Sequence, residues 1–227
     1  MKSYLFAALA AFALLTAVIG FAVQAGTTTF AERVEAAGSA GQKGESGIYE
    51  FDPAHTTIGF RVKHFGLIEI PGYFRDFKGT VNYNADDTAK SSVEFTAKTA
   101  SVDTGVAPRD KHLRTADFFD VEKHPEFSFR SSKVEKKGKG WTVTGDLTMK
   151  GVTKTISFPF QITGFVPGGG NSGPRMGITA ETQVDRRDFG INYGSTPKDG
   201  MLSIENMVTV VLQIEAVAPK PEAGQTK

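Results

Sequence analysis

Apolar and polar residues alternate with a period of two along most of this chain, and that alternation limits what the chain can fold into. In the segment 56–64, Ile58, Phe60 and Val62 fall on every second position. The pattern recurs in segments 79–84, 91–100, 126–151, 154–165, 176–184 and 203–217. A period of two puts one set of side chains on one face of a β-strand, whereas a helix needs a period of about 3.6. The chain is therefore expected to consist mainly of strands with one apolar face.

Strands of this kind cannot stay in an open sheet, because the apolar face would be exposed and the two edges unpaired. A closed barrel of about eight antiparallel strands solves both problems and has room inside for side chains or for one small ligand. Gly, Pro, Asn and Asp mark turns at 84–87, 138–140, 167–173 and 197–200, and Pro71-Gly72 is expected to be another turn. The predicted fold class is thus all-β, a closed antiparallel barrel.

The strand-forming segments define a single barrel domain, residues 48–217. Residues 26–47 contain five glycines and little apolar content, which is typical of a flexible linker. Residues 218–227 have the composition of a disordered tail. We find no internal repeat.

Residues 1–25 are expected to lie outside the fold. Lys2 precedes an apolar run of 19 residues from Leu5 to Val23, and Ala25 completes a Val-Gln-Ala end that a signal peptidase accepts. The run is also long enough to cross a bilayer. A cleaved secretory signal is favoured over a retained membrane anchor. Both alternatives place the rest of the chain in the periplasm or elsewhere outside the cytoplasm.

Charge and composition exclude several classes of function. Residues 1–25 hold one of the 26 basic residues and none of the acidic ones, so the remainder has 25 Lys+Arg against 25 Asp+Glu. This balance lacks the basic surplus that a nucleic-acid partner requires. The chain has no cysteine, which excludes disulfides, thiolate nucleophiles and cysteine-based metal sites.

The segment 109–129, RDKHLRTADFFDVEKHPEFSF, concentrates the residue types that do chemistry. His112 and His124 are twelve positions apart, which is not a compelling spacing for a metal site. The chain has no serine elbow, phosphate loop or H-E-x-x-H motif. An envelope enzyme that uses the His and Asp residues of 109–124 remains an alternative, but we expect no catalytic residue, metal or cofactor.

The same segment is expected to form a lid. Pro108 suits a first helical turn, and Arg109–Leu113 is predicted to be a short helix that covers one end of the barrel. Its Asp and Arg side chains would fix the loop, while Leu113, Phe118 and Phe119 would plug or gate the interior.

Four segments, in order, resemble the signature segments of the YceI family of bacterial envelope proteins. They are YEFDPAHTTIGFRVKHFG, RDKHLRTADFFDVEKHPEFSF, GDLTMKGVTKTISFPF and DFGIN, and they span nearly all of 48–217. The resemblance implies a lipocalin-like, periplasmic barrel. It also implies that a long apolar chain, such as a polyisoprenoid, an isoprenoid quinone or a fatty amide, binds inside the barrel for storage or transport.

The barrel interior is expected to be rich in phenylalanine, since 14 of the 18 Phe residues fall in the domain. From the residues alone, a packed core is favoured over a pocket, and a tethered interaction module with a solid core remains an alternative. The resemblance favours a pocket. Its expected apolar lining is Phe60, Val62, Phe74, Phe77, Val81, Phe95, Leu113, Phe118, Phe119, Phe127, Phe129, Leu147, Phe158, Phe160, Ile178 and Val210.

A ligand head group would need polar partners at the mouth, and the candidates are Arg61, His64, Arg186 and Asn192, with Asp185 and Arg187 beside them. His64 shares the face of Phe60 and Val62. Two roles fit this position equally well, contact with a ligand head group and an interior histidine hydrogen-bonded within the protein. The pair Arg186-Arg187 fits a solvated turn better than a phosphate clamp. Transient membrane contact and a homodimer through an exposed strand stay open.

Overall fold

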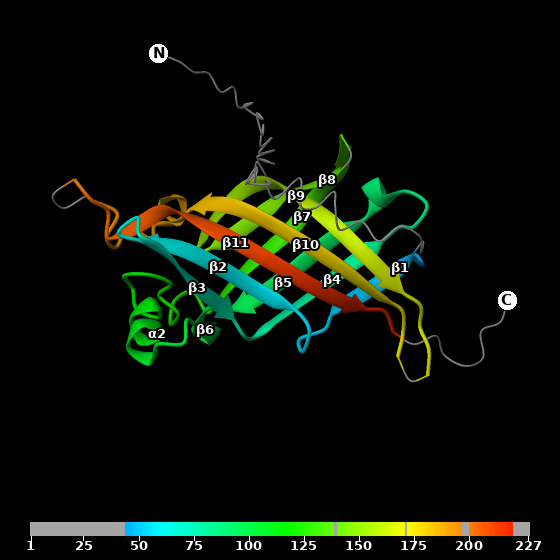
Figure 1. Cartoon of the computed structure of the whole chain (residues 1–227), viewed down its shortest axis with the longest axis horizontal. Helices are drawn as coiled ribbons and strands as arrows, with labels where there is room; N and C mark the ends of the chain where they lie inside the picture. The colour runs from blue at the N-terminus through cyan, green and yellow to red at the C-terminus, as the bar shows by residue number, and fades with distance from the viewer. Residues whose placement is uncertain (1–43, 139, 171, 197–199, 220–227) are drawn as a thin grey trace, which may run out of the picture.

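The structure is a computed structural model that describes residues 44–138, 140–170, 172–196 and 200–219. Its strands form one antiparallel sheet (Figure 1). The strands are β1 Gly47–Phe51, β2 Thr57–His64, β3 Ile68–Phe74, β4 Phe77–Tyr83, β5 Ser92–Lys98, β6 Val102–Asp103, β7 Glu126–Lys137, β8 Gly140–Met149, β9 Val152–Val166, β10 Arg175–Asp185 and β11 Ile204–Val217. The expected signal segment 1–25, the linker up to residue 43 and the tail from residue 220 lie outside the described residues.

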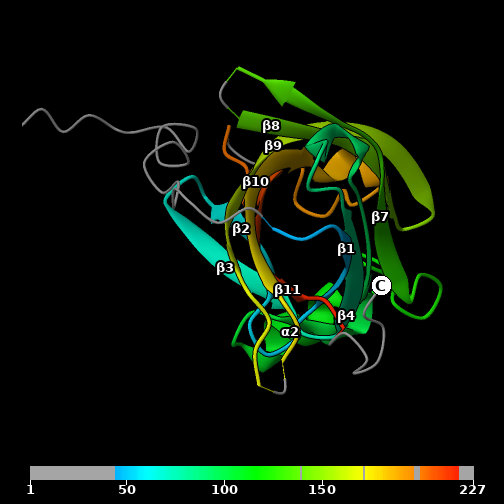
Figure 2. The same cartoon turned by 90° about the vertical axis from the view of Figure 1, so that its right-hand side faces the viewer.

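Eight of these strands close a barrel. The pairing order β1-β4-β5-β7-β8-β9-β10-β11 returns to its start because β1 also pairs with β11. Figure 2 shows the strands arranged around the barrel axis. The closed eight-stranded antiparallel barrel expected from the alternation, which is also the lipocalin-like fold that the resemblance implies, is therefore confirmed.

The remaining strands extend the barrel at one end. The long strand β11 pairs with β1 near its C-terminus and with β2 along most of its length. β2 then pairs with β3, and β3 pairs with the short β6. After β6 the chain forms helix α2, Ala107–Leu113, with Pro108 in its first turn. The helix expected over Arg109–Leu113 is thus confirmed, and it covers this end of the barrel beside β3 and β6 (Figure 1).

The alternation determines which side chains form the core. In β5, Phe95 and Ala97 are buried while Glu94 and Lys98 are exposed. Burying an apolar side chain of this size contributes about 1.5–3 kcal/mol, so a register slip by one residue would forfeit that contribution along the whole strand. The buried apolar residues of all the strands form one continuous core inside the barrel.

Pro71-Gly72 is not a turn, and this prediction is wrong. Both residues lie within β3, where Pro71 pairs with Arg61 and Gly72 with Phe60. β3 is paired on its other side only at Tyr73 and Phe74, so the missing N–H of Pro71 leaves no ladder bond unmade. A Cβ at position 72 would lie 2.2 Å from the Phe60 ring. Gly72 therefore provides space for an aromatic ring on the neighbouring strand.

The turn between β2 and β3 lies further upstream, at Phe65-Gly66. Both residues have positive φ, 49° and 68°, and the Leu67 N–H donates to the His64 carbonyl at 3.0 Å. Positive φ at both central residues is characteristic of a type I′ turn, whose twist matches that of the flanking strands. The turn places the Phe65 side chain at the tip of the hairpin, where it is exposed.

Candidate functional site

The barrel interior contains two apolar cavities that follow one another along the barrel axis. The larger cavity, about 140 Å³, lies at the α2 end, and the smaller cavity, about 60 Å³, lies towards the β1 end. Strand β10 shows the order, because Val184 and Thr182 line the larger cavity while Ala180, Ile178 and Met176 line the smaller one. The interior is therefore not a solid core, and the tethered module with a solid core does not fit this structure.

All but one of the apolar residues expected in the pocket border one of the two cavities. Those at the larger cavity are Phe60, Val62, Phe74, Leu113, Phe118, Phe119, Phe127, Leu147 and Val210. Those at the smaller cavity are Val81, Phe160 and Ile178. Phe95, Phe129 and Phe158 border both.

Phe77 is the exception. It is half-buried and packs against the core without bordering either cavity. Phe77 begins β4 directly after Arg75 and Asp76, which separate β3 from β4. Phe77 is the first residue of β4 and shares the face of Val81 and Tyr83, so alternation predicts its side of the sheet but not its position relative to the cavities.

Several lining residues were not among those expected. They are Ile58, Gly59, Met149, Ile156, Thr182, Val184, Phe189, Ile191, Ile204, Val208 and Leu212 at the larger cavity. Ile58, Ile156, Val208 and Leu212 obey the same alternation and could have been included on that ground. Phe189 and Ile191 lie in an irregular segment after β10, where no periodic pattern could have identified them.

Arg186 is the one cationic side chain in the lining of the larger cavity, and it is buried, with 6% of its surface exposed. Its guanidinium donates to the carbonyl oxygens of Glu205, Ile191, Tyr193 and Ile204 and to Oδ1 of Asn206, at 2.7–3.3 Å. Burial lowers its pKa from the ordinary value, but a guanidinium stays charged in proteins. The expectation of a solvated turn is wrong for Arg186, because its side chain is buried and donates to protein acceptors.

All five N–H groups of Arg186 are therefore engaged with neutral acceptors. They hold residues 191–193 and 204–206 against the end of β10. Arg186 thus acts as a clamp for the wall of the cavity and has no N–H left for a ligand. Its neighbour Arg187 is half exposed and pairs with Asp185 at 2.6 Å, as a solvated turn would.

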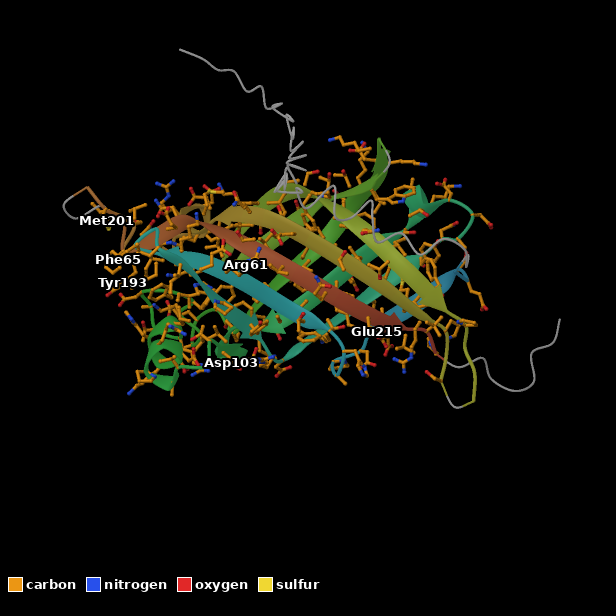
Figure 3. The ribbon with its side chains drawn as sticks, viewed as in Figure 1. Arg61, Phe65, Asp103, Tyr193, Met201 and Glu215 are labelled. Carbon is orange, nitrogen blue, oxygen red and sulfur yellow. The ribbon has the colours of Figure 1, made fainter. Side chains whose placement is uncertain are left out.

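The other polar candidates do not line either cavity. Arg61 lies on the outer face of β2, within 3.2 Å of Glu69 and 3.0 Å of Glu181 (Figure 3). His64 is exposed, and its ring packs on Phe65 with centroids 4.5 Å apart. The alternation fails for His64 because β2 ends there and the hairpin turn begins. Asn192 is exposed in the loop after Ile191.

Charged residues of the lid are used to fix its backbone. Asp110 is buried and accepts hydrogen bonds from the Thr104 N–H at 2.9 Å and the Thr104 hydroxyl at 2.5 Å. Arg109 donates to the Thr104 hydroxyl and carbonyl. Arg114 donates to the carbonyls of Ala100 and Val102, both at 2.7 Å. These contacts attach α2 to the end of the sheet at β6.

Three aromatic rings join this lid to the opposite rim of the barrel. The ring centroids of His112 and Phe118 are 5.1 Å apart, and each packs against Tyr193, at 4.8 and 5.1 Å. Lys150 donates to the Ala116 carbonyl of the lid at 2.9 Å and lies 3.4 Å from the Gly190 carbonyl of the rim. Phe118 borders the cavity, whereas Tyr193 is nearly half exposed (Figure 3). The ring cluster therefore separates the larger cavity from solvent.

The histidines of the lid form no recognisable catalytic arrangement in the described part of the chain. His112 Nε2 lies 2.8 Å from Asp117 Oδ2, but this pair is exposed on the outer surface. Among the described residues, the group that could hold a metal ion is Asp52, His55 and Glu215 at the β1 end. Arg175 already pairs with Asp52 at 3.1 Å and also with Glu215. We therefore regard that group as an ion-pair network.

Within the described residues, no helix is long and apolar enough to cross a membrane.

Comparison with known families matches residues 49–216 to the YceI-like domain. A UPF0312 protein from Photorhabdus laumondii is 40% identical over 159 residues, covering 67% of this chain and 81% of that protein. Protein YceI from Shigella flexneri is 36% identical over 196 residues, covering 85% of this chain and 96% of that protein.

Solved structures agree on the fold. A domain from Saccharophagus degradans, described as a polyisoprenoid-binding domain implicated in plant cell wall breakdown, superposes with a TM-score of 0.54 at 15% identity. The match covers 77% of this chain and all of that domain. At this identity the likeness concerns the fold alone. The matched domain and the two sequence relatives show that the chain belongs to the YceI family.

Proposed function

We propose that this protein binds a long-chain apolar lipid of the isoprenoid type inside the barrel and stores or carries it outside the cytoplasm. The observation that supports this most directly is the pair of apolar cavities along the barrel axis. Their lining comes from nearly every strand of the barrel and from the lid. The resemblance of the sequence to the YceI family leads to the same expectation, a long apolar ligand inside the barrel.

The energetics suit an apolar chain. Each CH₂ group moved out of water contributes about 0.8 kcal/mol, and ordering the chain offsets part of this. At about 0.3 kcal/mol per heavy atom, a segment of about fifteen carbons held in the interior would still contribute roughly 4–5 kcal/mol. The lining offers few hydrogen-bond partners, so the chain would be recognised by its length and shape.

The polar head group of such a lipid is expected to lie outside the apolar interior. Arg186 is the one cation in the lining of the larger cavity, and its five N–H groups already have acceptors. A buried charge or polar group without partners costs several kcal/mol. We therefore place the head group at the lid, near Tyr193, where solvent is available.

We propose that the protein acts by binding alone and that the histidines and carboxylates of the lid have no catalytic role. Asp110 and the nearby arginines hold backbone groups of the lid, and His112 lies on the outer surface. None of these groups borders the cavities.

The test is extraction of lipid from the purified protein, produced in a host that makes isoprenoids, followed by mass spectrometry. We expect a stoichiometric long-chain lipid. Phe158→Asp should remove it, because Phe158 borders both cavities, whereas Ser157→Asp, at an exposed position on the same strand, should retain it. Lipid-free wild-type protein, or equal retention by both variants, would refute the proposal.

A further inference from the structure

The two cavities meet at a waist formed by four residues. Phe95, Phe129, Phe158 and Leu212 border both the larger and the smaller cavity. The Phe129 ring lies between the other two rings, with centroids 6.0 Å from Phe95 and 5.5 Å from Phe158. Three rings thus form one side of the waist, on strands β5, β7 and β9.

Leu212 approaches the waist from the opposite wall. It lies on β11, and β7, which carries Phe129, is four pairing steps from β11 in either direction around the eight-stranded ring. An apolar chain that passes from the larger to the smaller cavity must therefore pass between Phe129 and Leu212.

A missing side chain on a neighbouring strand makes room for the Phe129 ring. A Cβ at Gly145 on β8 would lie 2.6 Å from Cζ of Phe129, so the ring occupies the space of an absent side chain. Phe129 is 2% exposed. A ring seated in a close-packed interior in this way has little freedom to swing aside.

The compartments that the waist separates are unequal and small. Their volumes are about 140 and 60 Å³, whereas pockets that enclose a drug-sized ligand commonly measure about 300–1,000 Å³. The larger compartment therefore suits one segment of an apolar chain, and the waist decides whether that chain can continue.

We propose that Phe129, together with Phe95, Phe158 and Leu212, sets the chain length of the lipid that the barrel retains. This inference rests on the proposed function. The lipid enters the larger compartment from the lid end, and the waist stops it before the smaller compartment. Each further CH₂ that finds an apolar site is worth about fourfold in affinity. A barrier at the waist therefore discriminates sharply between chains that fit the larger compartment and longer ones.

The experiment measures which of three linear prenols, farnesol, geranylgeraniol and solanesol, the protein retains from an equimolar mixture. Phe129→Ala should shift retention to longer prenols, with the ratio of solanesol to farnesol rising by about tenfold or more because the smaller compartment becomes accessible. Phe127→Ala provides the matched control, since Phe127 lies two residues away on the same strand, is buried and borders only the larger cavity. It removes the same ring without opening the waist, so its shift should be much smaller.

A double-mutant cycle separates passage through the waist from a general loosening of the core. Ala180 is buried and borders only the smaller cavity, so Ala180→Leu fills that compartment. The substitution should reverse the shift caused by Phe129→Ala. Phe129→Leu serves as the milder variant if Phe129→Ala does not fold.

Two results would overturn the waist proposal. One is an unchanged ratio of solanesol to farnesol in both Phe129 variants. The other is a shift of retention towards shorter prenols when Ala180→Leu is introduced alone. In either case the wild-type protein still retains a prenol. Failure of the wild-type protein to retain any of the three would instead refute the proposed function.

Discussion

At the β1 end the interior is sealed by tightly packed side chains, whereas at the α2 end a lid lies over a cavity. Tyr49 and Met176 are each 1% exposed at the β1 end, and the Tyr83 ring packs against Phe165 with centroids 5.0 Å apart. Ion pairs between Arg175 and the carboxylates of Asp52 and Glu215 lie outside this core.

The α2 end is closed by contacts of a different kind. A ring cluster on loops separates the larger cavity from solvent there. Several apolar side chains at this end are exposed, among them Leu67, 81% exposed. Met201, 54% exposed, lies at the same end (Figure 3). Loops with few buried contacts open more readily than packed strands, so we expect a ligand to pass through the α2 end. The predictions below test this difference, from the largest expected effect to the smallest.

Arg186→Met should have the largest effect on stability. It removes the donors from five acceptors in segment 190–206 and leaves buried carbonyl groups unpaired. We expect the free energy of unfolding to fall by about 4 kcal/mol, measured by urea denaturation. Arg187→Met, which breaks only an exposed ion pair with Asp185, should cost less than about 1 kcal/mol. Equal losses in the two variants would show that the clamp does not hold the α2 end.

Met176→Ala tests the sealed end. Met176 is 1% exposed and borders the smaller cavity, so the substitution enlarges that cavity, and the free energy of unfolding should fall by about 3 kcal/mol. The rate at which a bound prenol transfers to acceptor vesicles should stay within about twofold of the wild-type rate, since the route does not include this end. Faster transfer would show that the packed end also opens.

Phe118→Ala tests the lid. Phe118 packs against His112 and Tyr193 on loops, and loops can relax into the space that the ring leaves, so the loss in the free energy of unfolding should be smaller, about 2 kcal/mol. Prenol transfer should become roughly tenfold faster, because the contact between lid and rim is lost. The same vesicle assay measures it. A transfer rate equal to that of the Met176→Ala variant would show that the two ends of the barrel do not differ in how readily they open.

The smallest effect concerns pH and the ion-pair network at the β1 end. A hydrogen bond with Asp52 raises the pKa of His55 above 6.5, and the same bond with His55 is the main reason why the pKa of Asp52 lies below 3.8. The contribution of His55 to stability is present below pH 6.5 and is lost as pH rises through its raised folded-state pKa. The contribution of Asp52 is present above pH 3.8 and is lost as pH falls through its lowered folded-state pKa.

The network therefore stabilises the β1 end most between pH 3.8 and 6.5. Because His55 is exposed at the surface, the change in melting temperature should be slight. An NMR titration of His55 gives a clearer measurement. In Asp52→Asn the pKa of His55 should fall towards 6.5, and an unchanged value would mean that Asp52 is not its partner in solution.

The sequence predicted the barrel wall well because strand alternation is a local property. Phe95, Phe127 and Phe158 could be assigned to the interior without knowledge of any partner strand, since neighbours two positions apart share a face. The count of eight agrees with the closed ring, but the strands differ by one, because the expected segment 56–64 is β2, which lies outside the ring, and β1, Gly47–Phe51, was not expected.

The errors arose where contacts between distant segments decide the structure. Pro71-Gly72 resembles a turn until the Phe60 ring on the paired strand is considered. Arg186 resembles a surface residue until the carbonyls of segment 190–206 come into contact with it. His64 was misplaced because alternation does not indicate where a strand ends. The waist depends on ring positions across three strands, so no single segment of the sequence could have shown it.

Strand β11 joins the first and the last parts of the chain, since it pairs with β1, β2 and β10. During synthesis the ring cannot be completed until Ile204–Val217 has emerged, after all the other strands. Until then the unpaired edges of β1 and β10 are available to other molecules. Premature termination upstream of this strand would therefore leave these sheet edges unpaired and favour aggregation.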